Sequence, residues 1–267
     1  MNIALESQNS IQGRRAGFLS EVAAVAGRAL RSIKRDPETV IPALMIPVFF
    51  FVVTIGALQD MAETIPGVDF KAFQLPVAIM FAVTGISRAI PLVTDIQTGY
   101  FDRLSLTPVN RLALLLGLMV ADFALVVALT IPVVILGFAI GIRFETGLLG
   151  VLAFMLIGGI WGLVYTGFPY AIALKTGNPA AVNTSFLLFF PFMFLTTTFL
   201  PKEAMTGWMA TVATYNPVTY VLDALRSLIT VGWDGERLLY GFISISAIGL
   251  LSMTLAFMAL SGRVRKR

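Results

Sequence analysis

Cysteine and histidine are both absent from the 267 residues. Their absence excludes disulfides, thiolate chemistry and imidazole metal sites, and it leaves the serine-histidine-acid nucleophile without its base. A metal site built from carboxylates alone is still open, but no acidic residues cluster enough to suggest one. We therefore predict no catalytic residue and no metal site.

A phosphate-binding loop is also missing. The pattern G-x-x-x-x-G-K-[ST] does not occur, and the sequence does not contain a single Gly-Lys pair. A chain without this loop cannot hold ATP in the usual way. We expect no cofactor bound by this chain, and any active transport must be powered by another polypeptide.

Charged residues are scarce as well. They make up 13% of the chain, whereas about a quarter is usual in soluble domains, and hydrophobic residues make up 57%. The mean hydropathy of +0.87 indicates an integral membrane protein with one membrane domain. The net charge of +4 does not predict nucleic-acid binding, because the basic residues flank membrane segments, where they set topology.

Six apolar runs approach or exceed the length of about 20 residues that a bilayer core requires. We predict spans at 39–58, 72–93, 112–141, 147–174, 180–200 and 239–261. The fold class is therefore all-α integral membrane, with six transmembrane helices within a domain at 37–267. The third and fourth runs are long enough to tilt or to project beyond the bilayer.

The N-terminal region precedes this domain. Residues 1–16 are polar and lack the apolar core of a signal peptide, so we predict a cytoplasmic tail. In residues 17–36 the apolar side chains recur at helical spacing and would lie on one face of a helix, with charged side chains such as Arg28 and Arg31 on the other. This pattern is typical of an amphipathic interfacial helix. Asp36 and Pro37 then suit the start of a new helix.

Basic residues predict the orientation. With both termini cytoplasmic, the cytoplasmic side holds Arg14, Arg15, Arg28, Arg31, Lys34, Arg35, Arg103, Arg111, Lys175, Arg263, Arg265, Lys266 and Arg267. The outer side holds Lys71, Arg143, Lys202, Arg226 and Arg237. This asymmetry follows the positive-inside rule.

Two charges fall inside predicted spans, and intramembrane charges are costly and often functional. Arg88 is near the cytoplasmic end, from which it can snorkel, whereas Asp122 is about three turns into its span. A bond between the two is one possibility. Asp223 and Arg226, three residues apart, are expected to stabilise the polar stretch at 201–237 rather than to bind substrate.

The polar stretch at 94–111 carries the strongest motif. Its sequence T-D-I-Q-T-G-Y-F-D-R-L-S-L-T-P-V-N-R resembles the first cytoplasmic loop of the type-2 ABC transporter permeases, and Tyr100-Phe101 departs from the smaller pair more often found there. A second likeness combines Phe199-Leu200-Pro201, Trp208, Tyr215 to Tyr220 and Asp223 to Arg226. Length and loop style are most similar to the daunorubicin-resistance-type drug and lipid exporter permeases.

The resemblance implies a permease that works as a dimer, with a second copy of itself or a homologous permease. It also implies two copies of a separate ATP-binding subunit that carries ATP and Mg²⁺. The loop at 94–111 would form the coupling helix, and 201–237 an external re-entrant element before the last span. The location would be the bacterial or archaeal cytoplasmic membrane, with membrane lipid as a further partner.

Candidate site residues follow from this. The expected contacts with the ATP-binding subunit are Asp95, Gly99, Tyr100, Phe101, Asp102, Arg103, Leu104, Pro108 and Arg111, together with Arg28, Arg31 and Arg35 of the interfacial helix. We expect Tyr100, Phe101 and Leu104 to form an apolar anchor within a charged rim. The alternative is a solvated loop that merely reverses the chain.

The resemblance places a central cavity along the second and fifth spans. Candidate cavity residues are Thr84, Phe186, Phe189, Phe190, Met193 and Thr197. An aromatic wall with scattered hydroxyls suits a hydrophobic or amphipathic drug or lipid. The alternatives are export of a polysaccharide or lipid-linked glycan, a passive channel or membrane scaffold, and, least favoured, a membrane-embedded enzyme.

Overall fold

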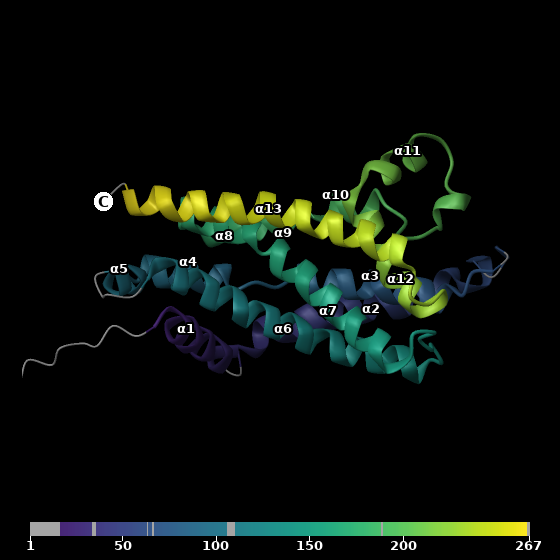
Figure 1. Cartoon of the computed structure of the whole chain (residues 1–267), viewed down its shortest axis with the longest axis horizontal. Helices are drawn as coiled ribbons and strands as arrows, with labels where there is room; N and C mark the ends of the chain where they lie inside the picture. Colours follow the sequence, from purple (N-terminus) through teal and green to yellow (C-terminus); the bar gives the residue numbers. More distant parts are fainter. Residues whose placement is uncertain are drawn as a thin grey trace, which may run out of the picture.

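The computed structural model describes residues 17–33, 36–62, 64–65, 67–105, 110–187 and 189–265, and the side chains of 39, 102, 104, 105, 264 and 265 are not described. Within these ranges the regular elements are helices, which agrees with the predicted all-α class. They form an elongated bundle in which α13 (Gly235–Arg265) runs along most of the length of the molecule (Figure 1).

The amino-terminal half of the chain forms α1 Phe18–Ile33, α2 Pro37–Ala62, α3 Phe70–Thr84, α4 Ala89–Gln97, α5 Tyr100–Ser105 and α6 Arg111–Ala139. The second half forms α7 Gly147–Tyr165, α8 Gly167–Thr176, α9 Pro179–Leu187, α10 Phe189–Phe194, the short 3-10 helix η1 Lys202–Ala204, α11 Gly207–Tyr215, α12 Pro217–Thr230 and α13 Gly235–Arg265.

Five stretches of the described residues are long and apolar enough to cross a membrane. They are Val40–Ala62, Phe70–Gln97, Arg111–Ala139, Gly147–Thr176 and Gly235–Arg263. Each overlaps a predicted span, so this is a multi-pass membrane protein. Two of these stretches are broken, one between α3 and α4 and the other at Thr166 between α7 and α8.

The span predicted at 180–200 is shorter than expected. The chain there forms α9, α10 and a turn at Thr196 to Thr198. The apolar helix there runs from Pro179 to Phe194, which is short of the length of about 20 residues that crosses a bilayer core. The six-span count is therefore not established by the helices described.

Several helices begin at residues that favour a helix start. Helix α2 begins at Pro37 as the sequence predicts, and α3 begins after Asp69, whose Oδ1 accepts from the N–H of Ala72 at 3.1 Å. Asn110 caps α6 by accepting from the N–H of Leu112 at 2.9 Å. Asparagine and aspartate are favoured here because their side chains satisfy N–H groups that the helix leaves free.

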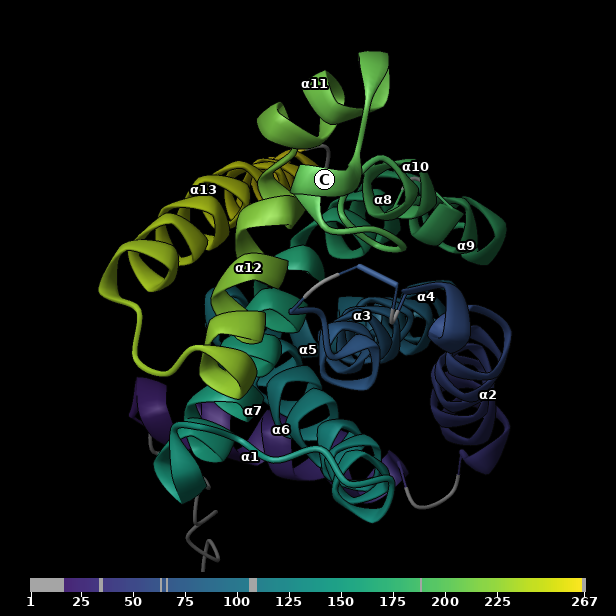
Figure 2. The same ribbon diagram turned by 90° about the vertical axis from the view of Figure 1, so that its right-hand side faces the viewer.

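The two ends of the bundle differ in what they carry. Helices α1, α4 and α5 gather at the end where the carboxyl terminus lies, and α11 lies near the other end (Figure 1). Viewed along the bundle, α12 lies among the long helices while α11 projects away from them (Figure 2). Helix α12 packs against α3, α7 and α13, so the polar stretch at 201–237 places one helix inside the bundle and one outside it.

Candidate functional site

The segment predicted to contact a partner forms the short helix α5, which follows α4 after a sharp turn. Gly99 makes this turn with a φ of +72°, in the region that favours glycine. The N–H of Arg103 donates to the carbonyl of Gly99 at 3.1 Å and so begins α5. The interhelix turn thus presents α5 as a short, separate helix at the end of the bundle.

Helix α1 fixes this segment from one side. Arg28 forms an ion pair with Asp95 on α4, with 3.1 Å between Nη2 and Oδ2, and its guanidinium lies 4.9 Å from the ring centroid of Tyr100. Glu21 accepts from the backbone N–H of Asn110 at 2.9 Å. Helix α1 therefore bonds to both ends of the turn that contains α5.

Close packing joins α1 to α6 as well. A Cβ placed on Gly117 would lie 2.6 Å from Cβ of Val25 and 2.9 Å from the carbonyl oxygen of Val22. Real Cβ atoms do not approach this closely, so only glycine allows the two helices to meet here. The apolar face of α1 thus packs partly on α6, while Phe18 and Leu19 are exposed.

The predicted partner-contact residues divide into exposed and inward-facing groups. Arg31, Arg103 and Arg111 are exposed, and Tyr100 is 37% exposed. Phe101 is only 6% exposed and packs in a cluster with leucines of α6 and α13, so it supports the turn from inside rather than offering an outward anchor. Arg35 and Pro108, and the side chains of Asp102 and Leu104, lie outside the described residues.

Asp122 of α6 lies at the break between α3 and α4. Its side chain is fully buried and accepts from the N–H of Arg88 at 2.8 Å, the hydroxyl of Tyr170 at 2.6 Å and the hydroxyl of Ser87 at 3.3 Å. A helix that starts inside a membrane leaves its first N–H groups without partners, and a carboxylate also suits the positive end of the helix dipole. Asp122 therefore caps α4 from another helix.

The bond to Arg88 that the sequence suggested is present, but it uses the backbone. The guanidinium of Arg88 instead lies 3.6 Å from the carboxylate of Asp36, with the arginine side chain 5% exposed. Asp36 stands between α1 and α2. The break in the second predicted span is thus connected to α6 and α8 through Asp122, and to the junction of α1 and α2 through Arg88.

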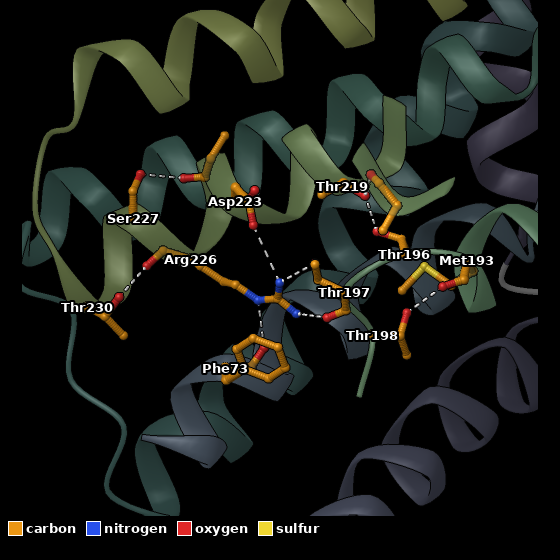
Figure 3. Close-up of polar contacts among 12 residues, drawn as sticks. Phe73, Met193, Thr196, Thr197, Thr198, Thr219, Asp223, Arg226, Ser227 and Thr230 are labelled. Carbon is orange, nitrogen blue, oxygen red and sulfur yellow. Dashed lines mark hydrogen bonds and ion pairs between the residues drawn. The ribbon is translucent and has the colours of Figure 1, made fainter. Parts of the chain in front are cut away.

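Arg226 of α12 forms a second polar network (Figure 3). It donates to the hydroxyl and the carbonyl of Thr197, each at 2.6 Å, and to the carbonyl of Phe73 at 3.2 Å. Its guanidinium lies 3.5 Å from the ring centroid of Phe73 and 3.6 Å from the carboxylate of Asp223. Arg226 therefore joins α12, α3 and the turn after α10, which agrees with its expected stabilising role.

The start of α12 holds the same turn. Asn216 caps α12 by accepting from Val218 at 3.0 Å and donates to the carbonyls of Phe192 and Leu195 at 2.6 and 2.9 Å. The hydroxyls of Thr196 and Thr219 are hydrogen-bonded to each other. These bonds satisfy the carbonyl groups at the end of α10, where the helix itself cannot.

Burial changes the acidity of the pair on α12, a helix outside the five candidate spans. Burial raises the pKa of Asp223 above its ordinary value, although Arg226 opposes this shift. Burial lowers the pKa of Arg226 to about 10, again partly offset by Asp223. Desolvation therefore outweighs the attraction within this pair, as is common for buried ions.

The predicted cavity residues do not share one open surface. Thr84 accepts from the indole of Trp161 at 3.2 Å, and Phe189, Met193 and Thr197 are at most 3% exposed. Phe186 is half-buried, and Phe190 is 42% exposed. Within this chain, these residues mostly pack α3, α7 and α10 together.

A cluster of phenylalanines lies around Phe190, and we call it the phenylalanine cluster. Its members are Phe50, Phe81, Phe190, Phe194 and Phe199. The ring centroid of Phe81 lies 4.9 Å from Phe50, 6.0 Å from Phe190 and 6.1 Å from Phe194. Phe190 and Phe194 are partly exposed, so the cluster presents an aromatic surface at the side of the bundle formed by α2, α3 and α10.

Sequence reasoning missed several partners in these networks. Tyr170 and Ser87 carried no signal of their own, since hydroxyls are common in this chain. The intramembrane charge of Asp122 was a signal that polar partners had to lie nearby. The Asn-Pro pair at 216–217 is a helix-start signature, but it does not reveal which carbonyls the amide group reaches.

Among known protein families, a model described as ABC-2 type transporter matches residues 20–230 of this chain. The chain is 31% identical over 220 residues to the daunorubicin resistance ABC transporter permease protein DrrB1 of Streptomyces coeruleorubidus, covering 78% of this chain and 75% of that protein. It is 26% identical over 217 residues to the probable doxorubicin resistance ABC transporter permease protein DrrC of Mycobacterium tuberculosis, covering 80% and 79%. It is 25% identical over 256 residues to the putative transport permease ycf38 of Pyropia yezoensis, covering 91% and 87%.

Proposed function

Because this chain belongs to the ABC-2 type transporter family, we propose that it is the permease subunit of an ATP-driven exporter. Its substrate is a hydrophobic or amphipathic drug or lipid. A separate ATP-binding subunit, present in two copies, carries ATP and Mg²⁺ and supplies the energy. The complex resides in the cytoplasmic membrane of a bacterium or archaeon, with six spans and both termini in the cytoplasm.

One observation carries the coupling part of this proposal: α1, α4, α5 and α6 are bonded together at one end of the bundle. The ion pair of Arg28 with Asp95 and the bond from Asn110 to Glu21 hold α5 in place. A preformed surface loses less entropy on docking. We assign Tyr100 as the aromatic contact for the ATP-binding subunit and Arg31, Arg103 and Arg111 as its charged rim.

The phenylalanine cluster supports the substrate part. We propose that a second permease subunit covers the exposed rings of this cluster together with the exposed apolar side chains of α2, such as Phe49 and Met45. Aromatic walls accept bulky apolar molecules in varied poses. We propose that this second subunit, identical or homologous, completes the cavity of which one protomer supplies only a wall.

Co-expression with the ATP-binding subunit tests the coupling proposal. Arg103→Glu reverses a rim charge on an exposed side chain and is expected to reduce co-purification of that subunit and drug-stimulated ATP hydrolysis at least about tenfold. Lys202→Glu, an exposed basic residue at the other end of the bundle, is the matched control. Unchanged co-purification and transport with Arg103→Glu would leave a passive channel or scaffold as the better description.

Substrate class is tested on the assembled complex. Phe190→Ala opens the phenylalanine cluster and is expected to weaken stimulation of ATP hydrolysis by an anthracycline, while leaving basal hydrolysis unchanged. Stimulation by a lipid-linked glycan in place of the drug would instead identify a glycan exporter.

A further inference from the structure

A groove runs between α8 and α13 on the outer surface of the bundle, toward the end that carries α1, α4 and α5. The two helices lie side by side over this length (Figure 1). The groove has a volume of about 730 Å³, which is within the size range of small-molecule sites. Neither the partner contacts nor the phenylalanine cluster accounts for it.

Polarity changes along the groove. Phe168, Ala171 and Leu255 line its apolar part, whereas Lys175 and Arg263 line the end nearest the carboxyl terminus. From Phe168 to Lys175 a helix rises about 10 Å, and from Leu255 to Arg263 about 12 Å. This length is shorter than one leaflet of the hydrocarbon core, which is about 30 Å thick in total. The groove therefore fits a molecule with a polar head and an apolar tail lying in one leaflet.

Charge selects the kind of head group. Nη1 of Arg263 donates to the carbonyl of Leu174 at 2.8 Å, which holds the guanidinium beside the turn that follows α8, and Lys175 is exposed. The ion pairs found among the described residues involve other basic side chains. The basic end of the groove thus keeps a positive charge, without an ion-pair partner among the described residues, next to the apolar part of the groove.

We propose that this groove binds an anionic glycerophospholipid. Its phosphate contacts Lys175 and Arg263, and one acyl chain lies along Phe168, Ala171 and Leu255. Basic pockets between membrane helices bind anionic head groups in this way. A free phosphate ion would use only the basic end and leave the apolar part empty, whereas a phospholipid uses both. The bound lipid is a structural or regulatory ligand and is distinct from the transported substrate.

Binding of matched lipids to the purified full chain tests the proposal. Native mass spectrometry compares phosphatidylglycerol with phosphatidylcholine of the same acyl chains. The wild type is expected to retain phosphatidylglycerol preferentially. Lys175→Gln is expected to weaken phosphatidylglycerol binding about fivefold, the effect of removing one basic group near a lipid surface, and to leave phosphatidylcholine unchanged. Lys202→Gln, an exposed basic residue at the opposite end, is the matched control and is expected to have no effect.

A second variant blocks the groove without altering charge. Gly262 lines the groove, and a Cβ placed on it meets no atom within 4 Å, so Gly262→Leu is compatible with the fold. The added side chain fills the groove and is expected to reduce binding of both lipids. Equal retention of the two lipids by the wild type, or identical behaviour of Lys175→Gln and Lys202→Gln, would overturn the proposal.

Two other occupants have distinct outcomes. The chain has no cysteine, so Met258→Cys, at a groove position that is 65% exposed, introduces a single thiol. A disulfide-linked dimer of this variant in native membranes would assign the groove to a second copy of the chain. Displacement of phosphatidylglycerol by inorganic phosphate alone would indicate a site for a free anion. Either result rejects the lipid.

Discussion

Asp122→Leu is expected to destabilise the protein more than any surface substitution. It removes the hydrogen-bond acceptor of Arg88, at the break between α3 and α4, and of Tyr170, just after the break between α7 and α8. The leucine side chain is larger than that of aspartate, so it leaves no cavity, and it cannot accept hydrogen bonds. It leaves the N–H of Arg88 and the hydroxyl of Tyr170 without their partner, in a site from which water is excluded. The cost therefore arises from unpaired donors rather than from a cavity.

The magnitude follows from the two short bonds. An unsatisfied buried donor costs about 1–3 kcal/mol, so two donors give a loss of about 4 kcal/mol. In a chain of this size each kcal/mol corresponds to roughly 2–4 °C in melting temperature, which gives a fall of roughly 8–16 °C. Tyr170→Phe removes one donor and leaves Asp122 bonded to the others, so its expected loss is about 1.5 kcal/mol.

Thermal unfolding of the purified chain in detergent, followed by tryptophan fluorescence, measures these shifts. Glu203→Gln changes an exposed acidic side chain and is the control. The double variant Asp122→Leu with Tyr170→Phe is expected to lose less than the sum of the single variants, because the tyrosine hydroxyl can be left unpaired only once. A melting temperature for Asp122→Leu within about 2 °C of the control, or strict additivity, would refute the capping role.

Three further predictions concern other parts of the molecule. Gly117→Val is expected to push α1 away from α6, because even a Cβ there meets Val25 at 2.6 Å; maleimide labelling of a cysteine at the buried position Ala26 should then accelerate, and unchanged labelling would argue against this packing. Arg226→Lys keeps the charge but cannot reproduce the bonds to Thr197 and Phe73, so unfolding measurements should show a loss of at least about 2 kcal/mol, whereas equal stability would mean that the guanidinium geometry is unimportant. Asp223→Asn should gain stability relative to the wild type as the pH rises from about 2 to about 8, because the raised pKa of Asp223 means that its ionised form costs stability above that pKa; the relative gain should be absent near pH 2, well below the ordinary pKa of 3.8, where the carboxyl is protonated in both states, and a pH-independent difference would contradict the assignment.

Long apolar runs were the most predictable part of the fold. Five of the predicted spans overlap helices of sufficient length, because hydrophobic length is a local property of the sequence. The fifth predicted span was less predictable. Composition alone counted 180–200 as one apolar segment, whereas the hydrogen bonds from Asn216 to the carbonyls of Phe192 and Leu195 hold the end of α10 at Phe194.

The polar turn that contains α5 was predictable from the sequence, but the directions of its side chains were not. The motif placed α5 on a polar turn between two spans, and helical spacing placed Arg28 on the polar face of α1. Neither shows that Arg28 bonds to Asp95, or that Phe101 points inward while Tyr100 is partly exposed. Such directions depend on contacts between segments far apart in the chain, which no local pattern specifies.

The break between α3 and α4 and the break between α7 and α8 occur at the same level, since Asp122 bonds to Arg88 at the first and to Tyr170 just beyond the second. Beyond them α4 and α8 are joined by the bond from Gln97 to the carbonyl of Gly177 at 2.9 Å. These two segments form a short lever of about 14 Å. A displacement of about 3 Å at α5 requires this lever to tilt by only about 12°, and the outer halves of both spans can stay in place.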